Sequence, residues 1–346
     1  MKSLFSPIAA PDAAFHRRAL ERQSQLTKPP GSLGMLENLA VRLAGMQGRD
    51  APSLENIHIS IFAADHGVAE EGVSAFPQAV TTEMVRNFSA GGAAVNVLAR
   101  HAKASFEVID VGLCRPVEMA GVIEQRAGNG TENFRLKPAM TPAQLDAALA
   151  AGIEAVQRAL DHGAELFIGG EMGIANTASA SAIAAALLGL PAEEITGAGT
   201  GLNAEQISYK ADVIVQALHR HRAALTSPLA ILQHVGGFEI AALAAAYISA
   251  AQHRLPVLVD GFISSVAALA ATKINPDCQL WFFFGHRSEE KGHKIILEAL
   301  AAEPILNLRM RLGEASGAVM ALPILQMACR LHNEMATFTQ ANITTG

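Results

Sequence analysis

The run IHISIFAADHG, residues 57–67, decides the fold class of this 346-residue chain. Its first part, Ile57–Ala63, is almost continuously apolar. That pattern predicts a strand covered on both faces, because a strand with one wet face would alternate polar and apolar residues. Its last part, Asp65-His66-Gly67, predicts a turn that carries polar side chains beyond the strand end. Four further runs predict strands of the same kind: Phe106–Val111, Glu165–Gly169, Pro256–Asp260 and Leu280–Gly285.

Longer stretches with helical periodicity separate these strands. Alternation of strands and helices is typical of an α/β fold, so the sequence predicts a mainly parallel sheet core with helices on both faces. Ligands of such sheets bind beyond the carboxyl ends of the strands, and a site is therefore expected at the turns that follow them. The expected helices are Thr81–Arg100, Pro142–His162, Asn203–His221 and Ile263–Thr272.

The two ends of the chain are helical and contain no convincing central strand. Asp12–Gln25 and Leu33–Gln47 are separated by the breaker Lys28-Pro29-Pro30-Gly31, and Glu314–Phe338 contains Pro323, which should kink or divide that helix. We expect the two ends to pack together as a small helical domain. The predicted division is 1–50 and 313–346 for that domain, with an α/β nucleotide-binding core at 51–312.

Composition excludes several classes of protein. Half of the residues are hydrophobic and 17% are charged, which excludes a disordered chain, and the net charge of −6 provides no basic field for nucleic acid. The longest apolar run, Ile240–Ala251, is too short for a membrane span. Three scattered cysteines and the lack of a signal peptide favour a cytoplasmic protein without disulfides.

A glycine-rich cluster and a serine that follows another strand are candidates for anion binding. The cluster 196–201, TGAGTG, precedes the helix expected at Asn203, and Lys210 lies two turns along it. Backbone amides at such a helix start can hold a phosphate, although a tight helix-entry turn is an open alternative. Ser288, after the strand that ends at Gly285, could close on the same anion. Neither a dinucleotide fingerprint nor a Walker loop is present, so no nucleotide cofactor is expected.

Three acids follow strand ends or begin helices. Glu171 lies between glycines at 170 and 173, and Glu314 between glycines at 313 and 317. Each could project a carboxylate into a crevice or simply cap a helix, and for Glu314 the helix start lowers the carboxyl pKa while an apolar pocket raises it. Asp260 ends a strand and is suited to a ribose hydroxyl.

The Asp65-His66 pair suggests a metal or acid–base site, but the other histidines lack a ligand rhythm. We therefore expect no metal, and we expect this pair to orient the loop or a substrate hydroxyl. No nucleophile elbow is present, which argues against acyl transfer.

Taken together, the motifs resemble those of the nicotinate-nucleotide–dimethylbenzimidazole phosphoribosyltransferase family, which makes the lower-ligand nucleotide of cobalamin. This resemblance implies transfer of phosphoribosyl from nicotinate mononucleotide to 5,6-dimethylbenzimidazole, with α-ribazole 5′-phosphate and nicotinate as products and inversion at the anomeric carbon. It also implies a Rossmann-like large domain, a small helical domain from both chain ends, and a homodimer. The motifs that carry it, in chain order, are TKPPGSLG (27–34), ADHGV (64–68), SAFPQ (74–78), GEMG (170–173), TGAGTGLN (196–203), GGFE (236–239), DGF (260–262) and RLGE (311–314).

The same resemblance implies a role for each site residue. Glu314 matches the family's single general base, and Glu171 and Asp260 match further acids of the pocket. The residues that match nucleotide-phosphate positions are Gly173, Gly199, Lys210 and Ser288, and those expected near the benzimidazole are Ser74, Gln78, Met172 and Leu312. No general acid is needed, because the positive pyridinium ring leaves as a neutral molecule.

Two other functions remain open on the sequence. A nucleosidase or hydrolase would direct water to the same anomeric carbon and release nicotinate without an acceptor base. A catalytically silent nucleotide-binding module would bind without forming a product. The intact Glu171 and Glu314 motifs argue against the silent module.

Overall fold

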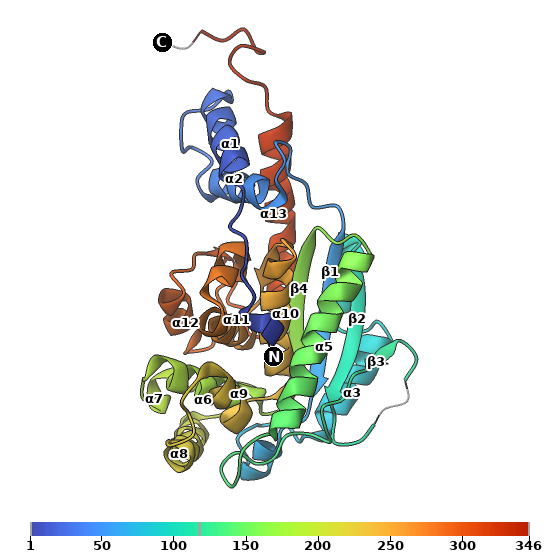
Figure 1. Ribbon diagram of the computed structural model, residues 1–346, viewed down its shortest axis with the longest axis vertical. Coiled ribbons are helices and arrows are strands. Elements are labelled where there is room, and N and C mark those ends of the chain that lie inside the picture. The colour runs from blue at the N-terminus through green and yellow to red at the C-terminus, as the bar shows by residue number, and fades with distance from the viewer. Residues whose placement is uncertain (1, 117–118, 345–346) are drawn as a thin grey trace.

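The computed structural model describes residues 2–116 and 119–344, and within them the chain forms a parallel sheet flanked by helices (Figure 1). This confirms the predicted α/β class. The sheet order is β3-β2-β1-β4-β5-β6-β7, in which the first six strands have the Rossmann order. The described strands are β1 (Ile57–Ala64), β2 (Ser105–Gly112), β3 (Val122–Glu124), β4 (Leu166–Met172), β5 (Val257–Val259), β6 (Phe282–His286) and β7 (Pro304–Leu306).

The strand order reverses between β1 and β4, which pair in parallel at the centre of the sheet. Every residue of both strands is buried, as their continuous apolar character predicts. In a sheet of this topology the crevice beyond the carboxyl ends of these two strands is the preferred ligand site. The crevice therefore opens next to residues 65 and 172.

Helices cover both faces of the sheet, as right-handed crossovers require. The helices α5 (Pro142–Asp161), α10 (Phe238–Gln252) and α11 (Phe262–Ile274) pack together on one face, and α3 (Ala79–Ser89) and α4 (Ala94–Ala102) contact β2 on the other. The chain between β4 and α10 forms α6 (Asn176–Leu188), α7 (Ala192–Ile195), α8 (Ala204–His221) and α9 (Pro228–Val235), and α12 (His293–Ala299) follows β6.

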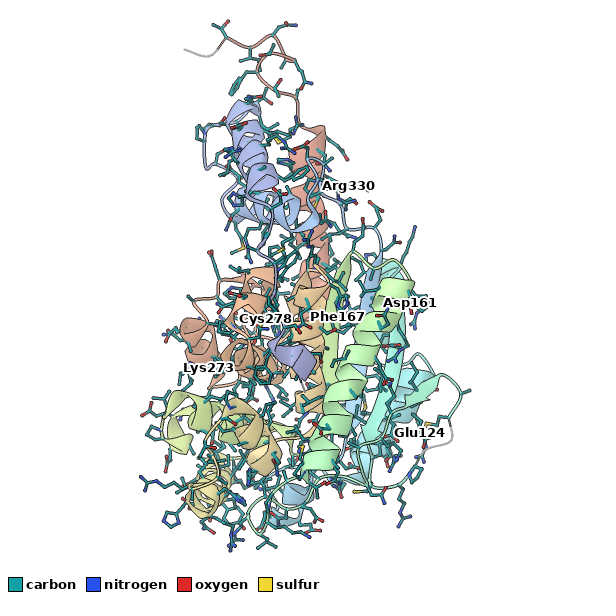
Figure 2. All side chains as sticks on the ribbon, in the orientation of Figure 1. Glu124, Asp161, Phe167, Lys273, Cys278 and Arg330 are labelled. Atoms are coloured by element: carbon teal, nitrogen blue, oxygen red, sulfur yellow. The ribbon has the colours of Figure 1, made fainter. Side chains whose placement is uncertain are left out.

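The apolar run at 240–251 is the interior of α10, which is buried from Phe238 to Ala251 between α5, α11 and the sheet. Among the helices of the described residues, none combines the length and the apolar run that a membrane crossing needs. Figure 2 shows Phe167 and Cys278 inside the protein, where both are fully buried, and Asp161 and Arg330 at its outside.

Several element boundaries differ from the sequence predictions. The helix expected at Thr81–Arg100 is divided into α3 and α4, because the chain turns at Gly91, whose φ is +78°. Strand β4 continues to Met172, so Glu171 lies in a strand and not in a helix turn. Residues Pro276–Trp281 form a 3-10 helix ahead of β6. The short strands β3 and β7, whose side chains are only partly buried or exposed, were not predicted.

The two ends of the chain pack together (Figure 1). Here α1 (Ala13–Gln25) and α2 (Met35–Gln47) lie beside α13 (Ser316–Glu334), which continues through Pro323. Arg22 donates from Nε to the carbonyl of His332 (2.7 Å), and Phe338 donates its N–H to the carbonyl of Gln25 (2.9 Å). Because α13 also contacts β6, one helix joins the terminal helices to the sheet, and the boundaries at 50 and 313 stay a prediction.

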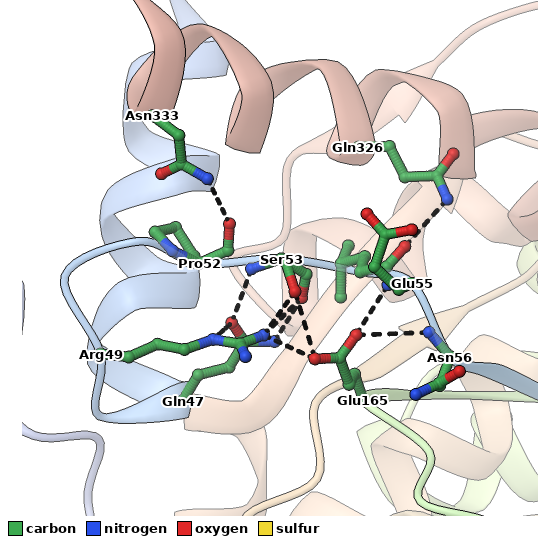
Figure 3. Close-up of polar contacts among 10 residues, drawn as sticks. Gln47, Arg49, Pro52, Ser53, Glu55, Asn56, Glu165, Gln326 and Asn333 are labelled. Carbon is green, nitrogen blue, oxygen red and sulfur yellow. Dashed lines mark hydrogen bonds and ion pairs between the residues drawn. The ribbon is translucent and has the colours of Figure 1, made fainter.

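The linker from α2 to β1 is clamped at the start of β4 (Figure 3). The Glu165 carboxylate accepts hydrogen bonds from Arg49 Nη2 and from the N–H of Glu55, each at 2.7 Å. From α13, Gln326 donates to the carbonyl of Leu54 and Asn333 to that of Pro52, each at 2.9 Å. This clamp ties the helical ends to the sheet and so helps to set where α13 begins.

Candidate active site

A cavity of about 480 Å³ opens at the carboxyl edge of the sheet, where the topology places a site. It is bounded by the ends of β4 and β5, the start of α6, the 197–201 loop, the segment that precedes α13, and α3. Eight of the predicted site residues are among those that line it: Glu171, Met172, Gly173, Gly199, Asp260, Ser288, Leu312 and Glu314.

Glu171 projects into the cavity from the end of β4 and is only 5% exposed. Its Oε2 accepts a hydrogen bond from the Asn176 amide at the first turn of α6. Burial raises the pKa of Glu171 to about 8, and the negative charges of Glu239 and Asp260 contribute to that rise. With this pKa the protonated form of Glu171 is favoured at neutral pH, and a cation bound beside it would favour its ionised form.

Glu314 reaches the same cavity through an unusual backbone. Gly313, Glu314 and Ala315 have φ values of 86°, 60° and 62°, a left-handed turn that costs non-glycine residues free energy and is tolerated where the structure demands it. A substitution at Gly313 would be strained by its φ of 86°, and a Cβ there would also lie 2.6 Å from Glu171 Oε1, so the Glu171 side chain would have to move. Burial raises the pKa of Glu314 to about 7, with a further contribution from Asp260.

Asp260 is hydrogen-bonded to the backbone at the start of α13. Its Oδ1 accepts the N–H of Ala318 at 2.7 Å and lies 3.7 Å from His286 Nε2. Helix α13 has no side-chain cap of its own, so this carboxylate supplies one from another element. This carboxylate therefore positions the helix start that carries Glu314, and because Asp260 also lines the cavity, its role as a ribose ligand stays a prediction.

A basic corner lies at the other side of the cavity. Lys210 is fully buried, and its Nζ donates to Thr177 Oγ1 (2.7 Å) in the first turn of α6. Burial lowers the pKa of Lys210 to about 8, and the charge of Glu290 counteracts this. Lys210 does not line the cavity itself, whereas its partner Thr177 and the nearby Gly199 do. A Cβ on Gly199 would lie 2.8 Å from Thr177 Oγ1.

Ser288 is held at this corner by a buried histidine. The Ser288 N–H donates to His293 Nδ1 (2.8 Å), which leaves the ring proton on Nε2, 3.0 Å from Ser265 Oγ. Burial lowers the pKa of His293 to about 3, so this histidine is neutral and structural.

An apolar wall completes the cavity. Phe76, Val80 and Met84 line it from α3 and the preceding loop, opposite Met172 and Ile174. Val80 and Met84 are four residues apart on one face of α3, and Phe76 lies in the loop three residues before this helix. The four-residue spacing of these apolar side chains could have pointed to the wall in the sequence.

Ser74 and Gln78, which we expected near the base, do not line the cavity. Ser74 Oγ lies 3.0 Å from Thr200 Oγ1, and Gln78 donates to the carbonyl of His66 (3.0 Å). Both residues therefore stabilise the loops at the rim of the cavity. Arg311 Nη1 donates to the carbonyl of Gly199 (3.1 Å), next to the Thr200 residue that Ser74 contacts.

His66 lies behind the cavity floor and is fully buried. Its Nε2 is 2.7 Å from Glu239 Oε1 and its Nδ1 is 2.9 Å from Ser179 Oγ. A Cβ on Gly173 would lie 3.1 Å from the ring, so His66 supports the floor at that glycine. Among the described residues, no three His, Cys, Asp or Glu side chains converge on a point that could hold a metal ion.

The sequence interpretation missed six polar residues that line the cavity: Asn176, Thr177, Thr200, Ser264, Glu290 and Arg311. Each is within four residues of a predicted site residue. Adjacency alone could not select them, because the same motifs also contain residues that face away from the cavity.

Known proteins with this architecture are similar over nearly the whole chain. Residues 8–343 match a family model described as phosphoribosyltransferase. The chain is 56% identical to the nicotinate-nucleotide–dimethylbenzimidazole phosphoribosyltransferase of Pseudomonas putida strain W619, covering 96% of this chain and 95% of that one. It is 58% identical to the enzyme of the same name from Azotobacter vinelandii, over 94% and 93%. The crystal structure of the Thermus thermophilus protein of this name superposes with a TM-score of 0.92 at 43% identity, covering 97% of this chain and 100% of that one.

Proposed function

The chain belongs to the nicotinate-nucleotide–dimethylbenzimidazole phosphoribosyltransferase family, and from this we propose that it transfers phosphoribosyl from nicotinate mononucleotide to 5,6-dimethylbenzimidazole. The products would be nicotinate and α-ribazole 5′-phosphate, for the nucleotide loop of cobalamin. The observation that carries the proposal is the convergence of Glu314, Glu171 and the Lys210–Thr177 corner on one cavity with an apolar wall.

The proposed reaction uses one general base. Glu314 takes the N–H proton of the benzimidazole while its other ring nitrogen forms a bond to the anomeric carbon. The bond from that carbon to the pyridinium nitrogen breaks on the opposite side, and the electron pair leaves with neutral nicotinate, so the configuration inverts. Glu171, ionised beside the cationic donor, would stabilise positive charge on the sugar, and the cavity supplies the proximity of the two flat rings.

The rate should depend on the protonation of Glu314. The proposed reaction needs both Glu314, with a pKa of about 7, and Glu171, with a pKa of about 8, in their ionised forms. We therefore expect kcat/KM to begin to fall below about pH 8 and to fall more than tenfold per pH unit below about pH 7. A bound pyridinium cation favours the carboxylate, so the acid limb of kcat should lie at lower pH than that of kcat/KM. Initial rates from about pH 5 to about pH 9 measure both limbs, and a kcat/KM that stays flat on both sides of neutrality would contradict the assignment.

The basic corner should hold the donor phosphate. Lys210→Met keeps the volume of the buried side chain and removes its charge, and we expect it to raise KM for nicotinate mononucleotide by about tenfold to a hundredfold. Lys294→Met, on an exposed lysine of α12, is the matched control. An unchanged KM in the Lys210 variant would place the phosphate elsewhere.

One assay separates the proposed transfer from its alternatives. The protein is incubated with nicotinate mononucleotide, with and without dimethylbenzimidazole, and products are identified by mass spectrometry. We expect nicotinate and α-ribazole 5′-phosphate only when the base is present. Nicotinate release without the base would indicate a hydrolase, and binding without any product would indicate a silent nucleotide-binding module.

We also propose that the enzyme is a homodimer located in the cytoplasm. Exposed apolar side chains support the proposal that a second copy of the chain packs against this one. Met320 and Met327 are exposed and seven residues apart on one face of α13, and Leu312 at the cavity mouth is 57% exposed. Free cysteines at 114, 278 and 329, all within the described residues, support a reducing compartment. Light scattering after size-exclusion chromatography tests the dimer, which a monomer mass would contradict.

A further inference from the structure

Glu290 is a buried carboxylate that the proposed reaction leaves unused. It follows β6, lines the cavity and is 9% exposed. Its backbone N–H donates to Ser288 Oγ (3.3 Å), which fixes the start of its side chain. Among the described residues, none donates a hydrogen bond to its carboxylate. Because this carboxylate lines the cavity and has no donor from the described residues, it is an acceptor available to a ligand in the cavity.

The position of Glu290 is restricted by its surroundings. A side chain on Gly197 would collide with Glu290 Oε2, so the carboxylate lies directly over this glycine of the 196–201 cluster. It is near enough to the Lys210 ammonium to act on its pKa. The carboxylate therefore borders the corner that is proposed to hold the phosphate of the donor.

The other acids of the cavity have defined tasks. Asp260 accepts from the backbone of α13, Glu171 accepts from Asn176, and Glu314 is the proposed base. A ribose 5′-phosphate anchored at the basic corner carries two hydroxyl groups within reach of the same wall. A carboxylate is the group that proteins commonly use to accept hydrogen bonds from ribose hydroxyls.

We propose that Glu290 binds the 2′- or 3′-hydroxyl of the donor ribose and makes the enzyme selective for ribonucleotides over deoxyribonucleotides. This inference rests on the proposed function. The competing role is that of a counter-ion for Lys210, which would affect every phosphate-bearing donor equally.

The test compares three donors on three proteins. Values of kcat/KM and dissociation constants from calorimetry are measured for nicotinate mononucleotide and its 2′-deoxy and 3′-deoxy analogues. The proteins are wild type, Glu290→Ala and the control Glu289→Ala, which changes the exposed neighbouring acid. A hydrogen bond to a charged acceptor predicts that wild type binds the ribonucleotide about tenfold to a hundredfold more tightly than the analogue that lacks the bound hydroxyl.

Glu290→Ala should lose that preference by weakening only the donors that retain the hydroxyl, and Glu289→Ala should keep it. An equal loss for all three donors would overturn the proposal in favour of the counter-ion role. Glu290→Gln, which keeps the shape and a weaker acceptor, should have an intermediate preference. Because calorimetry reads the hydroxyl preference without any transfer to benzimidazole, failure of the proposed reaction is distinguishable from failure of this inference.

Discussion

Glu314→Gln is expected to lower kcat by about 10²- to 10⁴-fold, the usual contribution of a general base. Glutamine has the same shape, but its amide cannot take the benzimidazole proton at neutral pH. The left-handed turn at 313–315 and the cap from Asp260 do not involve the Glu314 carboxyl group, so the fold should persist. Steady-state kinetics and calorimetry measure the effect, with donor affinity expected to change only a few-fold.

The matched control is Glu334→Gln, which makes the same chemical change at an exposed position at the other end of α13. It should retain wild-type turnover. A Glu314→Gln variant within fivefold of wild-type kcat would exclude Glu314 as the base.

Gly152→Ala is expected to destabilise the protein by about 3 kcal/mol, the largest effect on folding that we predict. Gly152 is on α5 where this helix crosses the buried α10. A Cβ there would overlap the carbonyl oxygen of Ala242 and lie 3.0 Å from the Ala246 nitrogen. Backbone atoms cannot rotate aside as a side chain can, so the two helices would have to separate.

Helix propensity acts in the opposite direction, because alanine is favoured over glycine by about 1 kcal/mol in a helix interior. Ala150→Gly, at an exposed position of the same helix, measures that contribution alone. Urea denaturation of both variants compares the two effects. A Gly152→Ala variant as stable as wild type would show that α5 and α10 are not packed this closely.

Long central elements could be predicted from the sequence because the features that define them lie within the element itself. The apolar run at 57–63 and the helix that starts at Asn203 depend on residue periodicity and on a capping side chain, and both are present in the structure. β3 and β7 have three residues each and no fully buried side chain, so they lack the buried apolar run that marks the equally short β5. Pairing with a neighbouring strand defines them.

The site residues likewise divide into those that could be selected from the local sequence and those that could not. Glu171 and Glu314 could be selected because each is an acid between glycines at the edge of an element. The chain contacts of Asp260 and Lys210 could not be predicted, because the partners of both, Ala318 and Thr177, are distant in sequence. The apolar wall at Phe76, Val80 and Met84 was missed although its helical spacing was visible.

The amino-acid sequence is enough to predict a parallel α/β sheet with helical ends, since burial of continuous apolar runs leaves few alternatives. It also predicts glycine-flanked acids at strand and helix ends. Which of these acids are free for a ligand depends on contacts between distant parts of the chain. Asp260 is occupied as a helix cap, and Glu290 is left without a donor among the described residues, because hydrogen-bond partners are chosen by proximity in space. Likewise, the pKa of Glu314 is raised to about 7 only once folding has buried it beside Asp260.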